Sequence, residues 1–183
     1  METSEFERRV GDPVPGVRLA ALAELADLAK RKEAGAEFVP ALLGLLGEPA
    51  GEVRSAAATA LGWIAFRAQT ADPALLEPAT RLLDDPVAMI RHDGAWILES
   101  LAQRGVADGK AIPALIRNLG HDNGDTRAAS AFCLYELAKI GHADPAALTA
   151  LEKLAATATD QTESRAATSP PADLKRRLGK VPR

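Results

Sequence analysis

Residues 45–64 read LLGEPAGEVRSAAATALGWI, and the centre of this stretch, Val-Arg followed by small residues and a leucine, returns along the chain. Its copies are centred on four arginines spaced 36, 37 and 36 residues apart: Arg18, Arg54, Arg91 and Arg127. The position before each arginine holds Val, Val, Ile and Thr in turn, position +3 holds Ala, Ala, Gly and Ser, and position +7 is always Leu. Positions −1, +3, +7 and +10 share one face of a helix, so each copy predicts a helix with a buried stripe.

A second apolar stretch precedes each of these helices, and an acidic residue or a His-Asp pair lies five or six residues before each arginine. The pair Asp-Pro, which suits a helix N-cap followed by a first-turn proline, occurs at 12–13, 72–73, 85–86 and 144–145. Each repeat is therefore predicted to be a helix, a short turn and a second helix. A unit of this size buries its apolar face only against its neighbours.

These residues resemble HEAT repeats, especially the short bacterial form called PBS-lyase HEAT-like, over about residues 4–157. The resemblance implies an all-α, right-handed α-solenoid of four full helix pairs plus a truncated C-terminal cap. It also places the arginine-bearing helices on the concave side and implies a binding scaffold. A fifth copy, with Asp160 and Arg165, is interrupted by Thr-Ser-Pro-Pro at 168–171. We expect one solenoid domain over 1–168 and a basic tail or short capping helix over 169–183.

Composition narrows the class of protein. The chain has 183 residues, of which 47% are hydrophobic and only 4% aromatic, so an aliphatic helical core is expected. Residues 164–183 hold six Lys or Arg and one Asp, which leaves the body with a net charge of −8. An acidic body argues against a nucleic-acid partner. No apolar run reaches membrane-spanning length and the first residues are unlike a secretory signal, so a cytoplasmic protein, monomeric or weakly homodimeric, is expected.

The four repeated arginines invite two interpretations. The one we favour is a structural ladder, in which each guanidinium bonds the acid of its own or an adjacent turn; the other is ligand binding. Cys133 is the single cysteine, so an intramolecular disulfide is excluded, and its position +6 predicts a place in the core.

The groove positions, defined as +1, +5, +8 and +12 from each arginine, lie opposite the buried stripe. Four of the seven aromatic residues fall there, and Trp63 borders the set. Exposed aromatic side chains are enriched at binding surfaces. We therefore predict non-enzymatic binding of a peptide, helix or loop of another protein; packing of the rings on one another is the alternative. The predicted partner-binding residues are Phe66, His92, Trp96, Glu99, Phe132 and Tyr135, with Trp63 and Asp93 at the border.

Two other functions stay open. Phycobilin lyases share this repeat class, and an aromatic groove with His92 and Glu99 suits a flat bilin or tetrapyrrole; this lyase or chromophore-chaperone is the runner-up. A HEAT-like nucleic-acid-binding protein, such as a DNA glycosylase, ranks third. No cofactor or metal is predicted, because the three histidines do not cluster and the His-Glu pairs of deoxyhypusine hydroxylase are missing. His92 and Glu99, two turns apart, are also a weak candidate for proton transfer.

Overall fold

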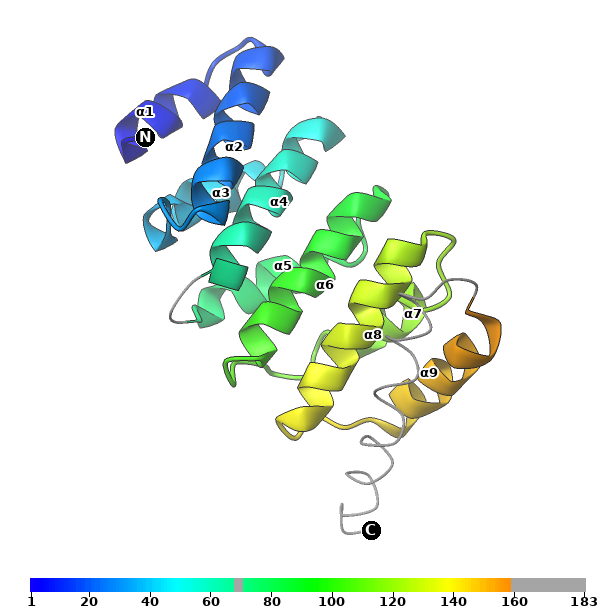
Figure 1. Cartoon of the computed structure of the whole chain (residues 1–183). Helices are drawn as coiled ribbons and strands as arrows, with labels where there is room; N and C mark the ends of the chain where they lie inside the picture. The colour runs from blue at the N-terminus through cyan, green and yellow to red at the C-terminus, as the bar shows by residue number, and fades with distance from the viewer. Residues whose placement is uncertain (68–70, 159–183) are drawn as a thin grey trace. The chain divides into compact units, whose positions relative to one another are not determined.

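The computed structural model describes residues 1–67 and 71–158, and all regular structure within these ranges is helical (Figure 1). The chain divides into two compact units, Met1–Ala71 and Asp72–Arg183. The single domain over 1–168 therefore stays a prediction. The tail at 169–183 and the decayed fifth copy lie outside the described residues.

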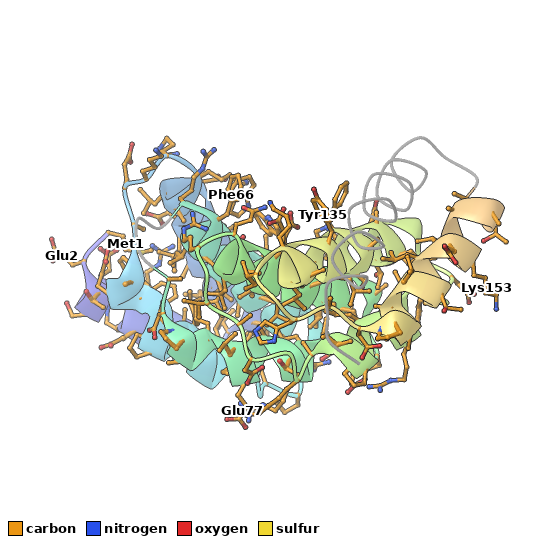
Figure 2. All side chains as sticks on the ribbon, turned by 90° about the horizontal axis from the view of Figure 1, so that it is seen from below. Met1, Glu2, Phe66, Glu77, Tyr135 and Lys153 are labelled. Carbon is orange, nitrogen blue, oxygen red and sulfur yellow. The ribbon has the colours of Figure 1, made fainter. Side chains whose placement is uncertain are left out.

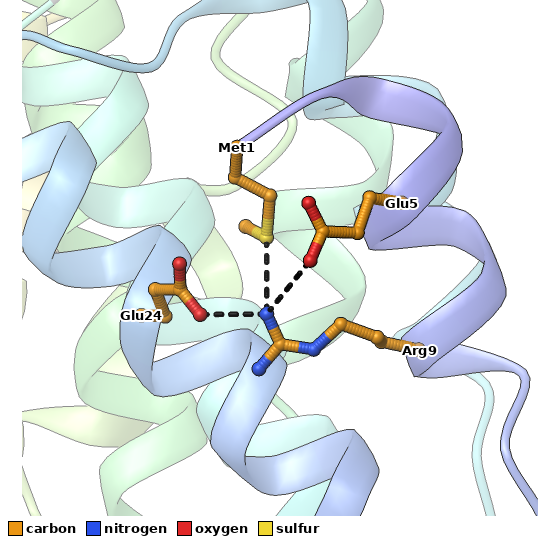
Figure 3. A network of polar contacts seen from close by, with 4 residues as sticks. All are labelled: Met1, Glu5, Arg9 and Glu24. Atoms are coloured by element: carbon orange, nitrogen blue, oxygen red, sulfur yellow. Dashed lines mark hydrogen bonds and ion pairs between the residues drawn. The ribbon is translucent and has the colours of Figure 1, made fainter.

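Unit 1 consists of two helix pairs in which α2 packs along α4, with α1 on α2 and α3 on α4. Its elements are α1 (Thr3–Val10), α2 (Pro15–Lys30), the 3-10 turn η1 (Ala36–Phe38), α3 (Val39–Leu45) and α4 (Gly51–Arg67). The Arg9 guanidinium fixes α1 to α2, because its Nη1 donates to the Glu24 carboxylate at 2.6 Å (Figure 3). The same nitrogen lies 3.6 Å from the Met1 sulfur and 3.8 Å from the Glu5 carboxylate.

Unit 2 repeats this arrangement, with α6 packed along α8, α5 behind α6, and α7 in contact with both α8 and α9. Its elements are η2 (Pro73–Leu75), α5 (Leu76–Leu82), α6 (Ala88–Ala102), α7 (Ile112–Asn118), α8 (Gly124–Lys139) and α9 (Pro145–Thr157). Side-chain bonds to backbone carbonyls help to tie its successive repeats together. The buried Asn118 amide donates to the Leu83 carbonyl at 3.1 Å, and the Thr126 hydroxyl donates to the Ala88 carbonyl at 3.0 Å.

The predicted stripe forms the core of both units. The four leucines at +7 and the four small residues at +3 are all buried. Cys133 is buried as well, as its position predicted. Thr126, the polar exception at −1, is fully buried because its hydroxyl has the Ala88 carbonyl as acceptor. The helical period of 3.6 residues thus accounts for what each of the arginine helices (α2, α4, α6 and α8) buries.

Gly94 lies at a close contact between α5 and α6. A Cβ atom at this position would lie 2.8 Å from the Leu82 Cβ and 2.9 Å from the Ala79 carbonyl oxygen. Glycine therefore allows α6 to approach the backbone of α5 more closely than any other residue would permit.

Each repeated arginine bonds its own turn. Its Nη1 donates to the carbonyl oxygen of the residue six positions earlier, at 3.1 Å for Arg18, 2.8 Å for Arg54 and 2.6 Å for Arg91, and Arg127 does the same to His121. The expected bond ran to the acidic side chain, whereas these bonds run to the backbone.

The prediction that Asp12 and Asp85 are helix N-caps is wrong, because the N-caps are Val14 and Val87. The two carboxylates instead accept a hydrogen bond from the backbone N–H two residues later, at 2.8 and 2.9 Å. This local bond shapes an Asx turn ahead of the helix. Asp72 and Asp144 do cap their helices as predicted.

Candidate functional site

Most of the predicted binding residues gather on α6 and α8 of unit 2. His92, Trp96 and Glu99 follow one another along a single face of α6, and all three are half-buried. Phe132 comes from the neighbouring α8 and is also half-buried. Together they border a cavity of about 150 Å³, whose lining is His92, Trp96, Glu99, Asp125, Ala128, Ala129 and Phe132.

Local sequence explains why a cavity exists between these two helices. Trp96 and Phe132 both occupy position +5 of their repeats, so large rings stand at equivalent places on adjacent helices. Ala128 and Ala129, one turn before Phe132, leave the space beside the rings unfilled. Asp125 lies in the first turn of α8, where a carboxylate is favoured by the helix dipole.

Burial controls the protonation of Glu99. Removal from water raises the pKa of its carboxyl group from 4.5 to about 7, and the negative charge of Glu136 adds to the effect while His92 opposes it. The Gln103 amide donates to Glu99 Oε1 at 3.0 Å. The cavity therefore contains a carboxyl group that takes up or releases a proton near neutral pH.

His92 is held by its neighbour in sequence. Its Nδ1 lies 3.0 Å from the Asp93 carboxylate, which raises the pKa of the imidazole although burial opposes the shift. The sequence predicts Asp93 at the border of the binding surface, yet Asp93 is only 2% exposed. Asp93 is therefore a buried residue that holds His92 by a hydrogen bond. The centroid of the His92 ring lies 6.5 Å from that of Trp96.

Tyr135 belongs to the same helix as Phe132 but does not line the cavity. Its side chain projects outward from α8 (Figure 2), with the Lys139 ammonium 5.3 Å from the ring centroid. Lys139 also donates to both carboxylate oxygens of Glu136, at 3.0 and 2.7 Å. A tyrosine ring and a Lys–Glu ion pair therefore lie next to each other at the edge of the site.

Trp63 and Phe66 occupy α4 in unit 1, where their rings meet edge to face at 6.1 Å between centroids. Phe66 is 39% exposed. The Lys30 ammonium lies 5.4 Å from the Trp63 ring, and the Arg67 guanidinium lies 5.7 Å from Trp63 and 5.1 Å from Phe66. These two aromatic residues therefore form a surface that the unit's own cations cover.

Sequence reasoning missed Asp125 and Glu136, two acidic residues that act on the cavity between α6 and α8. They occupy positions −2 and +9 of the fourth repeat, just outside the groove positions. Position +9 had already been used for Trp63, so extending the same rule to the fourth repeat would have found Glu136. Asp125 had no such signal, because only the packing of α8 on α6 brings its helical turn to the cavity.

The part of the chain that the structure describes contains neither a candidate metal site nor a candidate membrane span. No group of three or more His, Cys, Asp or Glu side chains in these residues is arranged to hold a metal ion. Within the same residues, no helix has the length and apolar character needed to cross a membrane.

Comparison with known proteins supports a repeat architecture. The family profile described as HEAT repeats matches residues 6–99. No curated protein matches the chain by sequence.

Several solved structures are similar to this chain in fold. A designed armadillo repeat protein in complex with the peptide (KR)4 has a TM-score of 0.72 at 18% identity, covering 98% of this chain and 87% of the designed one. An engineered protein has the same TM-score at 20% identity, over 95% of this chain and 80% of its own. The complex of CpcE and CpcF of phycocyanin lyase from Nostoc sp. PCC7120 has a TM-score of 0.63 at 19% identity, over 92% and 96%. At these identities the similarity shows an α-solenoid repeat fold.

Proposed function

Because this chain belongs to the HEAT-repeat family, we propose that it is a non-enzymatic scaffold that binds a peptide, helix or loop of a partner protein. The main contact is the α6–α8 surface, meaning the cavity lining together with Tyr135. The observation that carries the proposal is the pair of half-buried rings, Trp96 and Phe132, at the walls of an open cavity.

The chemistry of this surface suits protein recognition. Tryptophan and tyrosine provide large, rigid contact areas at low entropic cost, and they are enriched among the residues that dominate binding energy. Helix packing holds Trp96 and Phe132 in place, so little order has to be created on binding. The designed armadillo protein of similar fold binds a peptide, which supports the same use of this fold here.

The size of the cavity also favours a side chain as its occupant. Sites for whole cofactors or drug-sized ligands usually enclose about 300–1,000 Å³. A cavity of about 150 Å³ accommodates one side chain of a segment that runs over the surface.

The test is capture of partners from the native cell by the purified full chain, with cross-linking and mass spectrometry as readout. Trp96→Ala should weaken capture by more than about tenfold, because a central aromatic anchor is lost. Met89→Ala is the matched control, since Met89 is exposed at the start of the same helix and does not line the cavity. Circular dichroism should show equal helical content in both variants. Equal capture by both would rule out the α6–α8 surface as the docking site.

Bilin lyase or chromophore-chaperone activity is the second candidate, and the fold similarity to the CpcE–CpcF complex is the observation that favours it. Co-expression with a tetrapyrrole source should then give a visible absorption band that co-purifies with the protein. The scaffold proposal expects no such band. Nucleic-acid binding ranks third, because Glu99 and Asp125 at the cavity would repel phosphate groups.

A further inference from the structure

We propose that the cavity between α6 and α8 is a subsite for one cationic side chain, a lysine or arginine of the bound partner segment. This inference rests on the proposed function and adds the chemistry of its central contact. It is argued from two features of the cavity: its walls and its charged groups.

Aromatic rings form two of the walls. Trp96 and Phe132 stand on adjacent helices at the same repeat position, with the small side chains of Ala128 and Ala129 beside them. An ammonium or guanidinium group over the face of an aromatic ring, tryptophan above all, is attracted by the ring quadrupole. The methylene stem of lysine or arginine is in turn covered by the apolar wall.

The charged groups at the cavity have the complementary sign. Glu99 and Asp125 contribute carboxyl groups to the lining, and no lysine or arginine within residues 1–67 or 71–158 is part of it. The arginines that adjoin this set in sequence, Arg91 and Arg127, donate to the backbone carbonyls of Asp85 and His121. Lys139 of α8 is engaged by Glu136. Among the residues that the structure describes, Asp125 forms no ion pair, and the hydrogen bond to Glu99 comes from a neutral amide. A cation from outside would supply the missing partner for both carboxylates.

The raised pKa of Glu99 is the direction expected for a buried carboxyl group to which no cation is bound. Its carboxyl group has a pKa of about 7 because it is desolvated and faces the negative charge of Glu136, which outweighs the opposing effect of His92. A bound cation would stabilise the charged carboxylate and lower this pKa. His92, the basic side chain among the described lining residues, bonds Asp93 through its Nδ1, and the charges of Asp125 and Glu99 also raise its pKa.

The experiment measures binding of labelled octapeptides to the purified full chain by fluorescence anisotropy. The probe alternates lysine and arginine, and the comparison peptide replaces each with acetyl-lysine and citrulline, which keep the shape without the charge. We expect the cationic probe to bind more than about tenfold more tightly. The Trp96 indole N–H resonance should shift during the titration with the cationic probe.

Two variants test the carboxylates directly. Glu99→Gln and Asp125→Asn keep the side-chain shape, and together they should weaken binding of the cationic probe by about tenfold or more. Glu77→Gln is the matched control, because it removes the same charge from α5, on the opposite side of unit 2 from Tyr135 (Figure 2). It should change the affinity by less than about twofold, as expected for a distant screened charge. Thermal unfolding checks that every variant is folded.

Three outcomes would overturn the inference. One is equal binding of the two octapeptides, and another is equal loss in the Glu77 control and the double variant. The third concerns residues 164–183, which are basic. If Lys175, Arg176 and Arg177 are changed to Gln and the probe then binds more than about tenfold more tightly, the chain's own segment is the occupant and not a partner.

Capture that depends on Trp96 without a preference for the cationic probe would refute only this inference. If capture does not depend on Trp96 and the cationic probe is not preferred, the proposed function is refuted as well.

Discussion

The aromatic surfaces of the two units lie on the arginine helices but differ in their electrostatics. In unit 1, Lys30 and Arg67 lie over the rings of Trp63 and Phe66. In unit 2, Trp96 and Phe132 share a cavity with the carboxyl groups of Glu99 and Asp125. The rings of unit 1 therefore have cations over them, whereas no lysine or arginine of the described residues lines the cavity of unit 2.

This difference shows how a repeat fold varies its chemistry without changing its core. Positions +3 and +7, which are buried in all four copies, carry small residues and leucine, because packing between helices restricts them. The groove positions contact fewer neighbours and are free to differ. Two units of one architecture can thereby recognise different side chains.

The largest effect is expected from position +3, which is Ala57 in unit 1 and Gly94 in unit 2. Gly94→Ala should destabilise the protein by about 3 kcal/mol, because its Cβ would overlap the Ala79 carbonyl oxygen and the Leu82 side chain. Urea unfolding measures the loss. Gly44→Ala on α3 is the control, since its Cβ would meet nothing within 4 Å and should stabilise by up to about 1 kcal/mol. Similar effects of both substitutions would contradict the close α5–α6 contact.

The next effect is a pH dependence that unit 2 confers through Glu99. The pKa of this carboxyl is raised from 4.5 to about 7, so the folded state holds a proton that the unfolded state releases. The contribution of Glu99 to stability is therefore full below pH 4.5 and is lost as the pH rises toward 7, by up to about 3 kcal/mol. Glu99→Gln should remove this loss, so the variant should exceed the wild type in stability at pH 8 and match it near pH 4.5.

The other titratable groups around Glu99 are the same in the wild type and in the Glu99→Gln variant. They are His92, Asp93, Asp125, Cys133, Glu136 and Lys139. The pKa of His92 is raised, so its contribution to stability is full below pH 6.5 and is lost as the pH passes the raised value. Urea unfolding across the pH range separates the two groups, because only the Glu99 contribution disappears in the variant. Parallel curves for the two proteins would show that Glu99 is not the group responsible.

The smallest effect concerns the cations of unit 1. Lys30→Gln combined with Arg67→Gln should cost about 1 kcal/mol, since both cation–π contacts with Trp63 are exposed. Binding of the cationic octapeptide should change by less than about threefold, as these residues lie in the other unit. A change of tenfold or more would mean that the two surfaces act as one site.

Much of the fold follows from local patterns that a sequence displays directly. The leucines at +7, the small residues at +3 and the position of Cys133 were all predicted to be buried, and they are. The caps at Asp72 and Asp144 were also predicted. The Asp12 and Asp85 caps were wrong because each carboxylate closes an Asx turn, which has nearly the same sequence pattern as a cap.

The candidate site was only partly visible in sequence. Helical period brings His92, Trp96 and Glu99 to one face of α6, and this needs no tertiary structure. The pairing of Trp96 with Phe132 and Asp125 depends on how α8 lies along α6. Burial of Asp93 depends on the same packing, which is why its predicted place at the surface border was not matched by its exposure.

The amino-acid sequence by itself determined the repeat, the helices and the residues that each helix turns inward, because backbone hydrogen bonding imposes a fixed period on neighbours in the chain. Tertiary structure alone decided which side chains from different helices meet, how deeply Glu99 is removed from water, and which rings have cations above them. These properties depend on distances between residues that are far apart in sequence, and only packing sets such distances.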